Sequence, residues 1–353
     1  MRLIPAAAME ADYPLARAYL RGHEAKLRAR ENNKMNVEDG WWAYNYPKNL
    51  DRQETQKIIV PRLVAHVGCS VDAAATQYLD NVDVGGVAAA RDVSPFFLAA
   101  ALNAPPADFA FRRISKPFRG DYRSANKQFI APLPIPNASE ADRAALAHDA
   151  ERLQELYTQR RDSLSDTARR LGTIRIRPRA DNWLFPDLPP LDELIEAAPG
   201  RLIEAERRDW AKARLARLVE DRETALGEHL RAGVALSAEL YRGELRFMVD
   251  GIPATSGIFP IAAEAPFLLA QWCVLASRLD VTDKMDGKRL SALLKKVTPT
   301  AEAHIMADII ALQEAITATE VEITQIETRV NQTIYRLHAL TPAEIRMIEV
   351  DAR

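Results

Sequence analysis

The 353-residue chain is poor in cysteine and lacks a clustered set of metal ligands. Its two cysteines, Cys69 and Cys273, lie far apart, so we expect two free thiols in a reducing compartment rather than a disulfide framework. The six histidines are scattered, without the spacing that zinc sites use. These absences argue against a secreted disulfide scaffold and against a metal held by this chain.

The chain also lacks a long hydrophobic run and an excess of charge of one sign. Its longest apolar stretch, residues 265–279, is broken by Gln271 and Arg278 and falls short of the roughly 20 residues of a membrane helix. Residues 1–20 carry four charges and form no apolar signal region. Because the formal net charge is −2, any nucleic-acid surface must be local. We expect a soluble cytoplasmic protein with no membrane contact, and the length leaves room for two domains.

Motifs of nucleotide binding, base methylation and metal-dependent cleavage are missing as well. Gly85-Gly86 does not form the glycine-rich strand-to-helix turn of a nucleotide site. Residues 103–107 approach the Pro-Pro-aromatic motif of an amino-methyltransferase but lack the aromatic side chain that stacks on a flipped base. The carboxylates between residues 187 and 193 are interrupted by prolines and have no lysine beside them. The sequence therefore predicts no catalytic centre and no cofactor in this chain.

Residues 1–138 have the pattern of a small, compact α+β domain. The expected elements are a helix over 11–35, β segments over 57–67 and 75–84, a turn at Gly85-Gly86, and a helix over 95–102 that residues 103–106 end. Residues 111–136 are irregular, basic and rich in proline, which removes backbone donors and favours extended geometry. We expect the domain to end there.

Two long helical arms are expected to follow. In the first arm, residues 139–171, apolar residues recur at a spacing of seven: Ala150, Tyr157, Leu164 and Leu171. In the second arm the a/d spacing of a coiled coil holds for nearly four heptads, at Ile305, Ile309, Leu312, Ile316, Thr319, Ile323, Ile326 and Val330. We expect the arms to pair with each other as an antiparallel coiled coil, or to pair with another chain.

A mostly helical region, residues 172–299, would be inserted between the arms. It is expected to contain one hairpin near residues 244–261 and a buried helix over 265–279. Residues 300–353 then form the returning arm and a terminal helix. That last helix is expected to begin at Thr341-Pro342-Ala343-Glu344, which has the spacing of a capping box with proline at the first helical position.

A basic segment provides the candidate binding residues. From Arg112 to Lys127 there are six cations and one acid, a local net charge of +5, and aromatic residues lie between them. Cations on a loop neutralise phosphates, and arginine reads guanine edges. The alternative is a solvated loop with its aromatic residues in the core. The candidate DNA-binding residues are Tyr46, Lys48, Arg112, Arg113, Lys116, Arg119, Arg123 and Lys127.

A structural and a DNA-binding interpretation also apply to different members of an aromatic cluster, Trp41-Trp42-Ala43-Tyr44-Asn45-Tyr46-Pro47-Lys48. Trp42 and Tyr44 are expected to fill one side of a small sheet, whereas Tyr46 and Lys48 are the candidates for phosphate contact.

Several strings together resemble a known family. They are Trp41-Trp42-Ala43-Tyr44, Lys57-Ile58-Ile59-Val60-Pro61, Leu102-Asn103-Ala104, Phe118-Arg119-Gly120-Asp121-Tyr122, Phe129-Ile130-Ala131-Pro132-Leu133-Pro134-Ile135-Pro136 and the closing residues 330–345, which include Leu340-Thr341-Pro342-Ala343-Glu344-Ile345. In that order they resemble the TaqI-like C-terminal specificity (target-recognition) domain of type IIG restriction-modification enzymes and related adenine-N6 DNA methyltransferases. The likeness covers residues 1–138 and 320–349, and departs from the family at Asn331 and Ala339.

The resemblance implies that residues 1–138 read a sequence in double-stranded DNA and that the arms act as a spacer or dock a partner. The partner would be a methyltransferase or methyltransferase-nuclease subunit, which would hold S-adenosylmethionine and magnesium. Because recognition would begin at Met1, we expect a separate specificity subunit or the remnant of a split gene. The alternative is a coiled-coil protein-interaction module whose arms assemble with other chains.

Overall fold

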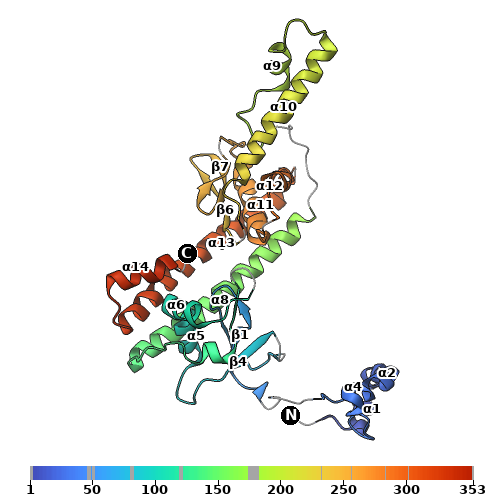
Figure 1. Cartoon of the computed structure of the whole chain (residues 1–353), viewed down its shortest axis with the longest axis vertical. Helices are drawn as coiled ribbons and strands as arrows, with labels where there is room; N and C mark the ends of the chain where they lie inside the picture. Colours follow the sequence, from blue (N-terminus) through green and yellow to red (C-terminus); the bar gives the residue numbers. More distant parts are fainter. Residues whose placement is uncertain are drawn as a thin grey trace. The chain divides into compact units, whose positions relative to one another are not determined.

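The computed structural model describes residues 3–45, 49, 52–79, 83–118, 122–173, 183–231, 233–255, 257–282, 284–300 and 302–351. They form a mixed protein of many helices and small antiparallel sheets, as the predicted α+β class requires (Figure 1). The chain divides into two compact units. Unit 1 comprises Met1–Gln154 and Ile326–Arg353, and unit 2 comprises Glu155–Gln325.

Unit 1 begins with short helices where one helix was predicted. The predicted helix over 11–35 is wrong: the segment forms α1 (Ala6–Asp12), α2 (Pro14–Gly22), α3 (Glu24–Arg28) and α4 (Arg30–Asn33). Pro14 has no backbone N–H to continue α1 and instead opens α2. The backbone of Glu31 and Asn32 is left-handed, with φ of 50° and 56°, so α4 is not a regular helix.

The aromatic cluster folds onto these helices and not onto a sheet. Trp41 is buried, and the guanidinium carbon of Arg17 lies 4.5 Å from the ring centroid of Trp42. Arg30 donates hydrogen bonds to the backbone carbonyls of Trp41 and Ala43 at 2.7 and 2.9 Å. Tyr44 is 71% exposed, so its predicted place in a core is wrong.

A three-stranded antiparallel sheet forms the centre of unit 1. It contains β1 (Lys57–Pro61), β3 (Ser70–Asp72) and β4 (Val84–Val87) in the order β3-β1-β4. The predicted turn at Gly85-Gly86 is wrong, because these glycines pair with Val60 and Ile59 inside β4. A Cβ on Gly86 would lie 3.0 Å from a methyl carbon of Leu79, so the Leu79 side chain would have to shift by a few tenths of an ångström to admit one.

Helices cover this sheet and lead to the basic segment. α5 (Pro95–Asn103) contacts β1 and β3, and α6 (Pro105–Ile114) follows directly because Pro105 is suited to a first helical position. The predicted irregular segment 111–136 therefore begins inside a helix. It continues through β5 (Arg123–Ser124), which pairs with β2 (Leu63–Val64), and α7 (Lys127–Ile130).

Two long helices, α8 (Glu140–Leu171) and α13 (Ala303–Leu337), contribute residues to both units. Within unit 1, Arg329 of α13 donates two hydrogen bonds to Asp149 of α8, at 2.6 and 2.8 Å. Every predicted a/d position of α13 is buried or half-buried. On α8 the predicted position Tyr157 is wrong, since it is 43% exposed while the preceding Leu156 is buried.

The chain ends in α14 (Pro342–Asp351), which contacts α6. The predicted capping box is confirmed: the Glu344 carboxylate accepts hydrogen bonds from the backbone N–H and the hydroxyl of Thr341, at 2.8 and 2.7 Å.

Unit 2 contains a second small sheet with a filled core. Its strands β6 (Leu236–Tyr241), β7 (Glu244–Val249) and β8 (Ile252–Pro253) form an antiparallel meander, so the predicted hairpin begins earlier than residue 244. α11 (Ala265–Arg278) packs on β6 and β7, and its Trp272 lies 5.7 Å from Phe247 between ring centroids. The predicted helix over 265–279 is confirmed.

The other helices of unit 2 are α9 (Leu191–Glu196), α10 (Glu204–Gly227) and α12 (Gly287–Leu294). The start of α12 lies directly against the backbone of α10. A Cβ on Gly287 would lie only 1.7 Å from the carbonyl oxygen of Glu223, so glycine is required at this position.

Candidate nucleic-acid interface

The predicted DNA-binding residues that the structure describes all lie in unit 1. Arg112 and Arg113 are on α6, Lys116 follows that helix, Arg123 is in β5 and Lys127 opens α7. Tyr46, Lys48 and Arg119 lie outside the described residues.

Arg112 and Arg113 face the end of the C-terminal helix. Arg113 donates to Asp351 of α14 at 2.9 Å, and Arg112 donates to the backbone carbonyl of the same residue. The guanidinium carbon of Arg113 also lies 3.3 Å from the ring centroid of Phe109. The hydrogen bond from Arg113, aided by the charges of Arg112 and Arg123, lowers the pKa of Asp351. These two arginines are therefore engaged within the protein, which reduces their availability for phosphate.

Two short segments, residues 116–118 and 122–124, lie antiparallel and expose aromatic side chains, and we call these two segments the basic hairpin. The backbone N–H of Phe118 donates to the carbonyl of Tyr122 at 2.9 Å, and that of Ser124 donates to the carbonyl of Lys116 at 3.1 Å. Phe118 is 69% exposed and Tyr122 is 54% exposed, while Lys116 is exposed as well. The aromatic residues of the basic segment therefore divide: Phe111 lies in the core, as the solvated-loop interpretation expects, whereas Phe118 and Tyr122 face solvent.

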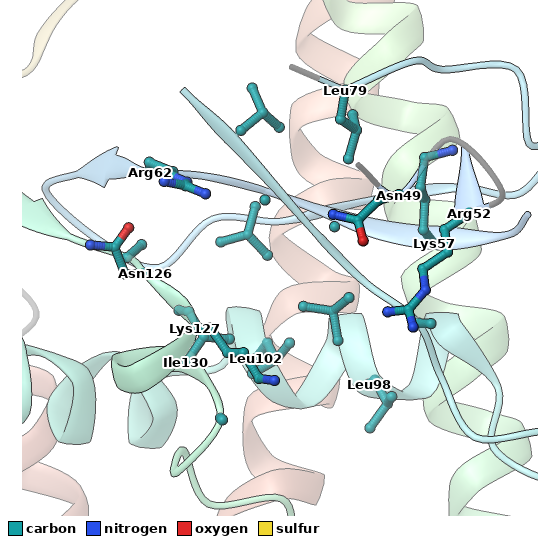
Figure 2. A pocket seen from close by; sticks show the side chains of 18 of the residues that line it. Asn49, Arg52, Lys57, Arg62, Leu79, Leu98, Leu102, Asn126, Lys127 and Ile130 are labelled. Atoms are coloured by element: carbon teal, nitrogen blue, oxygen red, sulfur yellow. The ribbon is translucent and has the colours of Figure 1, made fainter. Parts of the chain in front are cut away.

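A pocket of about 720 Å³ lies beside the base of this hairpin, in unit 1. Figure 2 shows Asn49, Arg52 and Arg62 on the side of the strands, with Leu98, Leu102 and Lys127 on the side of α5 and α7. Four cations line it, Arg52, Lys57, Arg62 and Lys127, and none of its described lining residues is acidic. The pocket therefore has a positive wall opposite an apolar one.

One of the four cations is neutralised by a buried partner. The amine of Lys57 lies 2.6 Å from a carboxylate oxygen of Asp72 and also donates to the carbonyl of Gln53 at 2.7 Å. Burial on its own would raise the pKa of Asp72, but hydrogen bonds from Lys57 and from the backbone N–H groups of Gln77 and Thr76 lower it. Lys57 and Asp72 thus hold β1 and β3 together and contribute little net charge to the pocket.

The other three cations keep their charge available. Arg52, Arg62 and Lys127 make no side-chain hydrogen bond or ion pair with any residue that the structure describes. Sequence reasoning named Lys127 and missed the two arginines. Arg62 follows directly after β1 but lies inside the β segment predicted over 57–67, so a cation within a predicted β segment was the signal that would have found it.

A histidine-carboxylate pair is the other polar contact of interest. Nδ1 of His66 lies 2.9 Å from the carboxylate of Asp108, which also accepts a hydrogen bond from the backbone N–H of Val67 at 2.8 Å. Burial raises the pKa of the Cys69 thiol to about 12, which favours its protonated form at neutral pH. The pair therefore anchors the loop after β2 to α6.

Within the described part of the chain, no group of three histidine, cysteine or acidic side chains is arranged to hold a metal ion. Nor does any described helix combine the length and apolar character needed to cross a membrane. No family model, curated protein or solved structure matches this chain. The resemblance to a specificity domain therefore stays a prediction from the sequence.

Proposed function

We propose that unit 1 binds double-stranded DNA and reads a short sequence in it. The observation that carries this proposal is the basic hairpin, where exposed Phe118 and Tyr122 lie beside Lys116, next to Arg62 and Lys127, two cations that pair with no described residue. An apolar side chain in such a position serves to contact base edges or to wedge between base steps, while the cations neutralise phosphates.

The backbone keeps these cations together. β2 and β5 are paired, and the backbone N–H of Ala125 donates to the carbonyl of Arg62 at 2.8 Å. Lys116 is joined to Ser124 by its own backbone hydrogen bond, and Lys127 follows three residues later. Rigid placement of several phosphate contacts sets the register of a protein on a duplex, which is the condition for reading bases.

The proposal includes the role that the sequence resemblance implies. The chain would be the non-catalytic specificity component of a type IIG-like restriction-modification system. It would direct a partner adenine-N6 methyltransferase, or methyltransferase-nuclease, which holds S-adenosylmethionine and magnesium. The long helices α8 and α13 would form antiparallel arms that act as a spacer or dock this partner. The pair Asp149–Arg329 in unit 1 and the pair Asp308–Arg170 in unit 2 support such pairing of the arms.

Selection of duplexes from a randomised pool by the purified full chain tests sequence reading. We expect enrichment of one short motif. The double variant Lys116→Gln/Phe118→Ser should lose that enrichment, whereas Arg346→Gln, which removes an exposed cation of α14, should retain it. A pool that stays random, or equal enrichment by the hairpin variant, would overturn the proposal.

Genomic methylation tests the partner. Co-expression with an adenine-N6 methyltransferase-like protein of the same cell should give adenine methylation at one motif only when this chain is present. If methylation is the same with and without the chain, it is not the specificity component.

A further inference from the structure

The pocket beside β1 and β4 has the composition of a ligand site, and two of its cations, Arg62 and Lys127, are also proposed to contact DNA phosphates. Its volume of about 720 Å³ lies within the range of about 300–1,000 Å³ typical of small-molecule sites. Such sites combine an apolar wall with a few placed polar groups.

The apolar wall comes from two helices and the chain after them. Leu98 and Leu102 of α5 and Ile130 of α7 lie on one side of the pocket (Figure 2), and Leu133 completes it. Leu102, Ile130 and Leu133 are held in the core of unit 1, so this wall is fixed. A flat ring stacks on a wall of this kind when it leaves water.

The opposite wall supplies charge for an anion. Arg52, Arg62 and Lys127 have no protein partner among the described residues, and no described carboxylate lines the pocket to compete for them. Guanidinium groups match the oxygen geometry of a phosphate, and an ammonium group adds a point charge. An uncharged ligand would leave these cations without a counterpart.

Two amide side chains complete the set of polar groups. Asn49 and Asn126 line the same pocket, and Asn126 donates to the hydroxyl of Ser124 at 2.7 Å. Side-chain amides offer both a donor and an acceptor, the combination that the edge of a nucleobase requires.

The geometry points to a binding site for one nucleoside monophosphate unit, with the base against Leu98 and Leu102 and the phosphate at Arg52, Arg62 and Lys127. Two sources have this chemistry: a free nucleotide, or a nucleotide turned out of the DNA that the basic hairpin binds. The second source rests on the proposed function, and the first does not.

Titration of the full chain with each of the four deoxynucleoside 5′-monophosphates, followed by calorimetry, tests the site itself. We expect binding of at least one of them, and binding weaker by about tenfold for the corresponding nucleoside without phosphate. Arg62→Gln and Lys127→Gln should each weaken the nucleotide by about tenfold, whereas Lys116→Gln and Arg346→Gln should leave it unchanged. Lys127 is exposed, so its variant keeps the test valid even if Arg62→Gln fails to fold.

The source is tested with two duplexes of one sequence, one fully paired and one carrying a single unpaired nucleotide opposite an abasic site. Tighter binding of the second duplex than of the first, with this preference lost in Arg52→Gln and competed by the free nucleotide, would identify the DNA nucleotide as the ligand. Equal binding of both duplexes together with binding of the free nucleotide would identify the free nucleotide.

Absence of binding by all four monophosphates, or binding that neither pocket variant weakens, would overturn the assignment. This result is distinguishable from failure of the proposed function, because loss of duplex binding in Lys116→Gln would still be measured separately.

Discussion

The three-stranded antiparallel sheets of unit 1 and unit 2 differ in what covers them. In unit 2, alternate residues of β7, Leu245, Phe247 and Val249, are fully buried, and Trp272 fills the space against them. Arg246 on the same strand is paired with Glu244 at 2.6 Å. In unit 1, β1 and β4 border a pocket, and Arg62 beside them has no described partner.

This difference separates stability from binding. Packing and the Glu244–Arg246 pair of the sheet in unit 2 contribute to the free energy of unfolding. The sheet of unit 1 is packed as well, with Ile58 and Val60 buried, but it also borders a pocket whose cations Arg62 and Lys127 pair with no described residue, so they remain available to a partner. The predictions below test this division in order of expected effect.

The largest effect is expected from removing the aromatic centre of unit 2. Trp272→Ala should lower the free energy of unfolding of unit 2 by about 3–5 kcal/mol, because it deletes a fully buried side chain and leaves a cavity. Urea denaturation followed by circular dichroism measures this, and the transition of unit 1 should stay in place. The control Phe259→Ala removes an aromatic side chain that is 68% exposed and should change little. Equal losses in both variants would contradict the account.

Breaking the buried pair of unit 1 should be nearly as costly. Asp72→Asn leaves the ammonium of Lys57 buried without its counter-ion, and we expect a loss of about 3–5 kcal/mol. Denaturant titrations of the wild type and the variant measure it.

The same pair gives a pH dependence of defined sign. Because the pKa of Asp72 is lowered in the folded state, its contribution is present above the ordinary aspartate value of about 3.9. It should be lost as the pH falls below that value toward the lowered pKa. A wild-type minus Asp72→Asn stability difference that stays constant from pH 7 down to pH 3 would disagree with this.

Exposed aromatic residues of the basic hairpin should affect DNA affinity without affecting its electrostatics. Phe118→Ser/Tyr122→Ser should weaken binding of the selected duplex by about tenfold, equivalent to about 1.4 kcal/mol, because apolar contacts with bases are lost. Fluorescence anisotropy at several salt concentrations measures both affinity and slope. A change of slope in this variant would place the aromatic residues in a different role.

The smallest effect on DNA is expected at Arg113. Arg113→Gln should change duplex affinity by less than about twofold, since a cation already paired with Asp351 releases few further counter-ions. Hydrogen exchange of α14 should rise instead, because the contact between α6 and α14 is weakened. If Arg113→Gln lost as much duplex affinity as Lys116→Gln, the ion pair between Arg113 and Asp351 would have to be broken in the DNA complex.

The sequence predicted those parts of the fold that are local. Apolar spacing located α11 and the a/d face of α13, and the spacing Thr341 to Glu344 located the start of α14. It failed where tertiary pairing decides the structure. Gly85-Gly86 has the composition of a turn, yet β1 pairs with it, and the heptad of α8 is displaced by one residue at Tyr157.

The candidate site was predicted only in part for the same reason. A run of cations in the sequence identifies a basic segment. It does not show which of those cations form ion pairs with distant residues, as Arg113 does with Asp351, 238 residues away. Arg52 and Arg62 belong to no basic run. Only the pairing of β2 with β5 and the folding of α7 bring them to one pocket with Lys127.

The salt dependence of duplex binding tests the central claim most directly. For the full chain, the logarithm of the association constant is measured against the logarithm of the salt concentration, in the wild type, in Lys116→Gln/Lys127→Gln and in Arg346→Gln. We expect the double variant to reduce the slope by about 2, since each phosphate contact contributes about 0.9, and the Arg346→Gln control to leave it unchanged. An unchanged slope in the double variant, or an equal reduction in the control, would contradict the assignment of this edge of unit 1 to DNA.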